Sequence, residues 1–395
     1  MLEKKRIAFV IQRYGQEVNG GAELFTRWLA ERLVTMAEVH VITTCAIDHQ
    51  TWANAYPPGD SEANGVTIHR FTVDAERRPD FPEQTAALFR GTHSFFDEYQ
   101  WMKDHGPFSA RLFDYIRTSY NYYDLFIFVT YLYPPTYFGL SLVPDKAILI
   151  PMAHDEPYLR LAIFRSLFHL ARAILYNTEP EKQLVAQIIP NIRAPQLVVG
   201  VGVNTPEGGS AERFRQKYGI EEPIVIYVGR IDEGKNVPEL LEYFARFRQQ
   251  TGRPLKLVLI GKPTIELPAR PDIAPLGFVS EQDKFDAICA ADVLIVPSKY
   301  ESLSIVALEA WLMERPALLN GHCEVLKHQA RQSNAGLYYH TYDEFATALK
   351  LLLDNPLLRA RMGRQGKAFV KAHYQWDVVM AKYRAILETL TTPTP

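Results

Sequence analysis

The second half of the chain carries a short cationic segment with the composition of a phosphate-binding loop. Gly229-Arg230 stands directly after the apolar run Ile224–Val228, and Lys235-Asn236 follows shortly afterwards. A guanidinium can bind two phosphate oxygens at once, an ammonium adds a point charge, and a glycine lets the backbone approach a ligand closely. An ordinary solvated turn explains this segment equally well when it is taken alone, so the interpretation depends on its neighbours.

A hydroxyl-rich segment follows a second apolar run. Ser302-Leu303-Ser304 comes after the predicted strand Asp292–Val296, and the pattern of Ile305–Leu312 predicts a helix that begins near Ser302. Serine is a preferred residue at a helix start. The free amide N–H groups and the positive dipole end there suit a phosphate. A plain capped helix is the alternative interpretation.

Two glutamates flank this segment, Glu301 and Glu309, with seven residues between them. If the intervening residues are helical, the rise between the two carboxylates is about 12 Å. Carboxylates are good acceptors for sugar hydroxyls, so the pair could hold the two ends of a folded nucleotide sugar. Two unrelated surface glutamates remain the alternative. The coincidence of spacing, preceding strand, helix start and upstream cations favours the nucleotide sugar.

With these motifs, the chain resembles the retaining glycosyltransferases of family 4, the glycosyl transferases group 1, over nearly its whole length. The family's Glu-x7-Glu signature matches Glu301 to Glu309. The resemblance implies that Glu301 contacts hydroxyls of the donor sugar and that Glu309 contacts the ribose. It also implies that Arg230 and Lys235 stabilise the charge of the leaving diphosphate. The family has the GT-B fold, in which two Rossmann-like lobes with parallel sheets face a central cleft.

The resemblance extends to the base pocket and has one departure. Phe278 and Val279 match the family's loop that lines the nucleotide base, so they are predicted to bind the donor. Many members have Gly-Phe-Gly after the first glutamate, where this chain has Ser302-Leu303-Ser304. Serines still leave the backbone amides available, and we therefore keep all three residues in the predicted donor site.

The N-terminal half contributes two further predicted site elements. Gly20-Gly21 follows the first apolar run, Ile7–Ile11, and opens a helical pattern. It lacks the G-x-G-x-x-G spacing of a dinucleotide site, and a tight turn is the alternative to close approach of a phosphate or sugar. The resemblance places both glycines in the donor site and His154 close to the donor sugar as a catalytic residue. Thr178 is predicted to cap a helix.

Short apolar strands alternate with helical segments along the chain, which predicts an α/β fold with parallel sheets. The alternation restarts after a Gly- and Pro-rich joint, so we expect two domains. The first covers residues 1–205 and binds the acceptor, and the second covers residues 206–374 and binds the donor. The last helix, residues 375–395, is expected to pack back on the first domain. Strands are predicted at Ile7–Ile11, Glu38–Thr43, Leu125–Val129, Lys146–Ile150, Ala173–Tyr176, Gln196–Val199, Ile224–Gly229, Leu255–Ile260, Asp292–Val296 and Pro316–Leu319.

Composition excludes other classes of protein. The formal net charge is -2, with 43 basic and 45 acidic side chains, which argues against a dedicated nucleic-acid partner. Three scattered cysteines fit a cytoplasmic protein without structural zinc, and no apolar stretch reaches the 18 residues of a membrane span. The basic segment Tyr158–Ala171 is predicted to be a helix, which could touch the membrane surface or a lipid-linked acceptor; a partly solvated helix is the favoured interpretation.

The predicted reaction is transfer of a sugar from a nucleoside diphosphate sugar to a hydroxyl of a glycan or a lipid-linked acceptor. By the resemblance, the anomeric configuration is retained. No Asp-x-Asp motif lies between strands of the second half, so we expect no metal on the diphosphate and no cofactor beyond the donor substrate. A sugar-nucleotide epimerase of the same fold and a non-catalytic glycan-binding protein are the alternatives.

Overall fold

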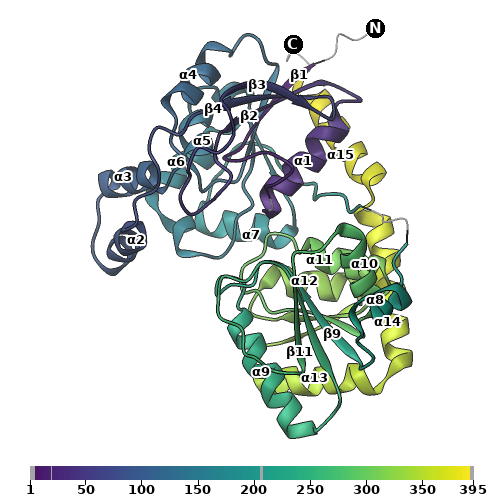
Figure 1. The fold of residues 1–395 in the computed structure, drawn as a ribbon. Coiled ribbons are helices and arrows are strands. Elements are labelled where there is room, and N and C mark those ends of the chain that lie inside the picture. Colours follow the sequence, from purple (N-terminus) through teal and green to yellow (C-terminus); the bar gives the residue numbers. More distant parts are fainter. Residues whose placement is uncertain (1–4, 19, 205–207, 392–395) are drawn as a thin grey trace. The chain divides into compact units, whose positions relative to one another are not determined.

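The computed structural model describes residues 5–18, 20–204 and 208–391. The chain divides into two compact units, Met1–Val201 with Met380–Pro395, and Gly202–Val379 (Figure 1). The predicted domain boundary between residues 205 and 206 lies outside the described residues, as do residues 392–395 of the predicted last helix. That helix, α15 (Trp376–Thr391), contributes to both units. Each unit is built on its own sheet, as the alternation of strands and helices predicted.

The sheet of the first unit has the strand order β3-β4-β2-β1-β5-β6-β7-β8. All described pairs are parallel except β3 with β4, a hairpin at the edge. Its strands are β1 (Arg6–Val10), β2 (Glu38–Thr44), β3 (Gly59–Ala63), β4 (Val66–Phe71), β5 (Leu125–Val129), β6 (Ala147–Ile150), β7 (Ala173–Tyr176) and β8 (Gln196–Val198).

Helices and two 3₁₀ turns connect these strands. They are α1 (Gly21–Leu33), α2 (Phe81–Arg90), α3 (Phe95–His105), α4 (Ala110–Thr118), α5 (Pro134–Leu140), η1 (Pro144–Lys146), η2 (Pro157–Arg160), α6 (Ala162–Leu170) and α7 (Glu179–Ile188). The single helix predicted over Tyr158–Ala171 is wrong. Extended backbone at Leu161, with ψ of 140°, separates the turn η2 from α6.

The central strand β1 lies where the order of the first sheet reverses. Its Ile7 pairs with Val39 of β2 on one side and with Leu125 of β5 on the other. β5 is buried along its whole length and β1 from Ile7 onward, as expected for strands covered on both faces of a parallel sheet. The carboxyl ends of β1 and β5 therefore form the switch point at which open α/β sheets bind ligands.

The sheet of the second unit has the order β11-β10-β9-β12-β13-β14, and all its described pairs are parallel. Its switch point lies between β9 and β12. The strands are β9 (Ile224–Val228), β10 (Lys256–Ile260), β11 (Ile273–Gly277), β12 (Val293–Val296), β13 (Ala317–Asn320) and β14 (Gly336–Tyr339). The helices are α8 (Ala211–Tyr218), α9 (Val237–Thr251), α10 (Glu281–Ala290), α11 (Ile305–Leu312), α12 (Glu324–Ser333), α13 (Tyr342–Asp354) and α14 (Pro356–His373).

Helices α9 and α13 cover one face of this second sheet (Figure 1). Leu240 and Phe244 of α9 and Phe345 and Leu349 of α13 are fully buried in one core with the strands. Burial of such side chains contributes roughly 1.5–3 kcal/mol each and holds the loops at the strand ends on a rigid base. In the part of the chain that the structure describes, no helix is long and apolar enough to traverse a bilayer.

Candidate active site

The two segments predicted to bind phosphate leave neighbouring strands at the switch point of the second sheet. Residues 229–236 follow β9 and residues 297–304 follow β12, and these strands pair at Val225↔Val293 and Ile226↔Leu294. Because the strands are parallel, both segments emerge at the same edge of the sheet. This is the place where open α/β sheets bind their ligands.

Close backbone contact fixes the course of the first segment. Gly229 has a φ of +151°, and a Cβ added to Gly261, at the end of β10, would lie 1.8 Å from the carbonyl oxygen of Gly229. Both positions therefore require glycine. Beyond them, the hydroxyl of Tyr227 donates to the carbonyl of Arg230 at 2.5 Å. The half-exposed guanidinium of Arg230 pairs with Asp232 at 3.2 Å.

Lys235 and Glu301 meet in an ion pair between the two segments. The Nζ atom of Lys235 donates to Oε1 of Glu301 at 2.7 Å. The backbone N–H of Lys235 donates to Oδ1 of Asp232, also at 2.7 Å. Two residues that the sequence assigned to the diphosphate and to the donor sugar, 66 positions apart, are thus in direct contact.

One carbonyl group ties three loops of this edge together. The oxygen of Pro297 accepts from Nδ2 of Asn236 at 3.1 Å and from Nδ2 of Asn320, at the end of β13, at 2.8 Å. Asn236 adopts a φ of +58°, which asparagine tolerates better than most residues. Sequence reasoning missed Asn320, which is buried. The one sequence feature that could have indicated it is an amide side chain at the end of the apolar run Ala317–Asn320.

The helix after the second segment begins later than predicted. The structure starts α11 at Ile305, with Ser304 as the N-cap residue, so Ser302 and Leu303 belong to the preceding loop. Ser304 makes no side-chain capping bond. Its backbone N–H donates to Oε1 of the buried Gln329 at 3.4 Å. The predicted rise of a continuous helix between Glu301 and Glu309 is therefore wrong, because half of that interval is loop.

Glu309 lies inside the unit rather than at the loop edge. Its Oε1 accepts from the Nζ atom of Lys284 on α10 at 2.8 Å, and Lys284 also contacts Glu281 at 3.0 Å. Burial raises the pKa of the Glu309 carboxyl, an effect that Lys284 opposes. Burial works against the charge of Lys284, yet the carboxylates of Glu309 and Glu281 raise the pKa of its ammonium. Sequence reasoning missed Lys284 because it belongs to a different helix.

The predicted base-binding residues follow β11 directly. Phe278 is 71% exposed, and Val279 is partly buried. An exposed phenyl ring at the carboxyl end of a strand offers a stacking face to a planar base.

The remaining predicted site residues belong to the first unit. Gly20 is the N-cap of α1 and Gly21 is its first residue. A Cβ at Gly20 would lie 2.0 Å from the Glu23 carboxylate, whereas nothing lies within 4 Å of a Cβ at Gly21. His154 follows β6, and its Nδ1 lies 3.8 Å from Oε1 of Glu156. The prediction that these residues serve the donor stays a prediction.

The buried carboxyl group of Glu181 lies near His154, at the same edge of the first sheet. Glu181 accepts backbone N–H bonds from Asn177 at 2.7 Å and from Ala153 at 2.8 Å. Thr178 caps α7 through Glu181, as predicted. Burial nevertheless raises the pKa of Glu181 to about 7.

We expect Glu181 to make the stability of the protein depend on pH. Its folded-state pKa of about 7 lies above the unfolded value of about 4.3, so the folded state binds the proton more tightly and stability falls as pH rises between those values. From pH 5.5 to pH 8, the free energy of unfolding should fall by about 2 kcal/mol. Denaturant titrations of the wild type and of Glu181→Gln check this, since the variant should lose most of that dependence. An equally steep dependence in Glu181→Gln would contradict it.

Among the described residues, no group of three or more His, Cys, Asp and Glu side chains could hold a metal ion. The cysteines are free; Cys45 and Cys323 are buried and Cys289 is partly buried.

The unit that contains Lys235 and Glu301 is similar in sequence to a known family of proteins. Residues 210–369 match the family described as Glycosyl transferases group 1. The match covers most of the second unit and less than half of the chain. The group 1 match includes Arg230, Lys235, Glu301 and Glu309, and the residues of the first unit lie outside it.

Two curated relatives illustrate the range of the sequence similarity. An alpha-D-kanosaminyltransferase from Streptomyces kanamyceticus is 32% identical over 180 residues, which is 41% of this chain and 44% of the relative. A D-inositol 3-phosphate glycosyltransferase from Kineococcus radiotolerans is 28% identical over 241 residues, 53% of this chain and 55% of the relative. The chain thus spans about half the length of the curated relatives it matches.

Solved structures extend the fold assignment beyond that unit. A sucrose-phosphate synthase from Thermosynechococcus elongatus has a TM-score of 0.74 at 17% identity and covers 98% of this chain and 99% of its own. HepE from Anabaena in complex with UDP and glucose has a TM-score of 0.68 at 16% identity, with coverage of 98% and 99%. The fold is GT-B, as the resemblance implied.

Proposed function

We propose that this protein transfers a sugar from a nucleoside diphosphate sugar to a hydroxyl of an acceptor, with retention of the anomeric configuration. The observation that carries the proposal is the contact of Lys235 with Glu301, 2.7 Å apart at the switch point of a group 1 unit. A cation for the diphosphate thereby stands beside a carboxylate for the sugar hydroxyls. Relatives named as glycosyltransferases and a neighbour in complex with UDP-glucose support the donor class.

In this reaction, positive charge develops on the sugar and negative charge on the departing diphosphate. Arg230 and Lys235 would stabilise the departing diphosphate, together with the backbone N–H groups at the start of α11, because preorganised donors aimed at developing charge lower the barrier. These protein cations can take the place of a metal ion on the diphosphate. Glu301 would accept hydrogen bonds from hydroxyls of the donor sugar, and Phe278 would stack on the base.

Incubation of the protein with a panel of labelled nucleoside diphosphate sugars tests this function. Hydrolysis of one donor, or its transfer to an added glycan or lipid-linked acceptor, is the expected result. Isomerised nucleotide sugar without an acceptor would instead show an epimerase. Binding without turnover in the presence of acceptors would show a protein that recognises nucleotide sugars without catalysis.

Arg230→Ala tests the assignment of the diphosphate within the same assay. We expect a loss of more than tenfold in kcat/KM, about 1.4 kcal/mol of transition-state stabilisation, because one of the two cations facing the leaving group disappears. Near-normal kinetics would remove Arg230 from the mechanism.

A further inference from the structure

Asn320 is a fully buried polar side chain at the carboxyl end of β13. Its Nδ2 atom donates to the carbonyl oxygen of Pro297 at 2.8 Å, and its Oδ1 atom accepts from the backbone N–H of His322 at 2.9 Å. Because a carbonyl oxygen can only accept and a backbone N–H can only donate, these two bonds determine which end of the amide faces which group. Asn320 is therefore a fixed hydrogen-bond donor to Pro297.

The carbonyl of Pro297 has both of its acceptor positions filled. A carbonyl oxygen offers two lone pairs, and the second donor is Nδ2 of Asn236 at 3.1 Å. Asn236 directly follows Lys235 along the chain, and Pro297 begins the segment that carries Glu301. One carbonyl thus connects the backbone beside Lys235, the segment of Glu301 and, through Asn320, the buried strand β13.

The segment of Glu301, residues 297–304, is also held further along its length. Burial raises the pKa of the Cys323 thiol to about 11, whereas the backbone N–H of Glu301 lies close enough to the sulfur to lower it. At the end of the segment, the backbone N–H of Ser304 donates to Gln329 at 3.4 Å. The residues after β13 and helix α12 therefore support this backbone at its start, middle and end.

We propose that Asn320 is a positioning residue for sugar transfer, because it holds the loops of Lys235 and Glu301 in register through one carbonyl. The inference rests on the proposed function, in which these two side chains act on the diphosphate and the sugar. They lie 2.7 Å apart and both belong to loops, so their separation depends on the bonds between the loops. Misplacement by about 1 Å can cost about a hundredfold in rate. Asn320 thereby affects the chemical step without contact with the reacting atoms.

Asn320→Asp tests this role. The variant keeps the shape of the side chain, but it can donate to Pro297 only while its carboxyl is protonated. Burial raises the pKa of such a carboxyl, so we expect the protonated form at pH 5.5 and the ionised form, which repels the Pro297 carbonyl, at pH 8. With the donor identified in the panel, kcat should lie within about threefold of wild type at pH 5.5 and at least about tenfold below it at pH 8. KM for the donor should change less than kcat, because alignment acts in the transition state.

Each kcat is divided by the wild-type value at the same pH. The ratio removes the titration of the ionisable groups that both proteins share around this carbonyl, which are Lys235, Glu239, Lys299, Glu301, His322 and Cys323. A ratio that is the same at both pH values would overturn the proposal.

Asn320→Leu carries the test if Asn320→Asp does not fold at pH 8 by circular dichroism. It has no donor at any pH, so its kcat should be at least about tenfold below wild type at both pH values. Wild-type kcat in this variant would overturn the proposal.

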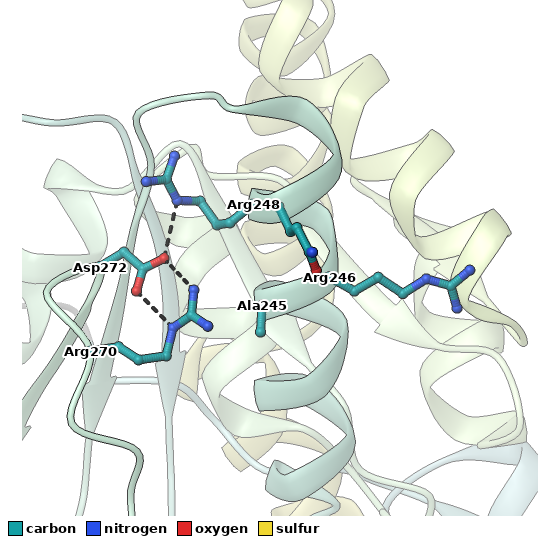
Figure 2. A pocket seen from close by; sticks show the side chains of 6 residues that line it. Ala245, Arg246, Arg248, Arg270 and Asp272 are labelled. Atoms are coloured by element: carbon teal, nitrogen blue, oxygen red, sulfur yellow. Dashed lines mark hydrogen bonds and ion pairs between the residues drawn. The ribbon is translucent and has the colours of Figure 1, made fainter.

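Asp272→Asn is the matched control, because it exchanges a carboxylate and an amide in the reverse direction at the opposite end of the same sheet. Asp272 precedes β11 in a pocket that α9 also lines, and it accepts from Arg270 at 3.0 and 2.9 Å and from Arg248 at 3.2 Å (Figure 2). Arg270 and Arg248 lower the pKa of this carboxyl to about 2, so the variant weakens charged hydrogen bonds far from Glu301. Its kcat should stay within about twofold of wild type. A loss equal to that of Asn320→Leu would show that general destabilisation is the cause and would overturn the proposal.

Hydrogen exchange separates this inference from the proposed function. In Asn320→Leu, the backbone amides of residues 229–236 and 298–304 should exchange at least severalfold faster than in wild type, whereas in Asp272→Asn they should not. Wild-type exchange rates in Asn320→Leu would overturn the inference. A wild-type protein that turns over no nucleotide sugar would instead count against the proposed function, and the exchange rates would still decide whether Asn320 holds the two segments together.

Discussion

Lys235→Ala should lower kcat/KM for sugar transfer by about a hundredfold to a thousandfold, the range for removal of one preorganised group that stabilises transition-state charge. The ammonium lies 2.7 Å from Glu301 at the switch point, so it would act on the leaving diphosphate next to the donor sugar. Steady-state kinetics with the donor identified in the panel measure the effect. Because the charge develops in the transition state, kcat should fall more than KM rises.

Lys256→Ala is the matched control for this variant. Lys256 begins β10 at the opposite end of the same sheet and pairs with Glu222 at 3.2 Å, so its loss should leave kcat/KM within about twofold. A Lys235→Ala enzyme whose kcat stays within threefold of wild type would remove Lys235 from the chemical step. A large rise in KM alone would limit its role to binding.

Lys284→Met should lower the free energy of unfolding by about 3–5 kcal/mol, the usual cost of removing one partner of a buried ion pair. Lys284 and Glu309 are both buried and lie 2.8 Å apart, so the variant leaves a carboxylate uncompensated in the interior. Denaturant titration of the full chain measures the loss. Hydrogen exchange at the amides of α10 and α11 locates it.

Two further variants separate the charge effect from packing. Lys284→Met combined with Glu309→Leu removes both charges and should recover most of the lost stability, since well-packed apolar residues often replace a buried ion pair without cost. Lys217→Met is the control, because Lys217 on α8 is 55% exposed and its pair with Asp283 contributes little. No recovery in the double variant would show that the pair acts through shape rather than charge.

Strands that are buried on both faces were predicted closely from the sequence. The predictions for β5 (Leu125–Val129) and β7 (Ala173–Tyr176) agree with the structure to the residue, because such strands are continuous apolar runs. The edge hairpin was missed, since β3 (Gly59–Ala63) is exposed and polar, with no apolar run to signal it. Its place is determined by pairing with β4, which no local pattern encodes.

The loops of the site were predicted in position but only partly in shape. The sequence placed Arg230, Lys235 and Glu301 after the correct strands because a strand end can be read locally. The start of α11 was placed too early, since contacts from distant residues hold the loop before it, among them the bonds of Asn236 and Asn320 to Pro297. The pairing of Glu309 with Lys284 is likewise a tertiary contact that motif spacing cannot show.

The contact between Lys235 and Glu301 also affects which anions can bind Lys235. Any phosphate that binds Lys235 has to compete with a carboxylate that is tethered 2.7 Å away and therefore present at high effective concentration. On the proposed function, a diphosphate would compete better than a single small anion such as chloride, because it carries more charge and would have Arg230 as a second cation to bind. Binding of the diphosphate to Lys235 would free the oxygens of Glu301 for the hydroxyls of the attached sugar. One exchange of partners would then couple recognition of the phosphates to recognition of the sugar.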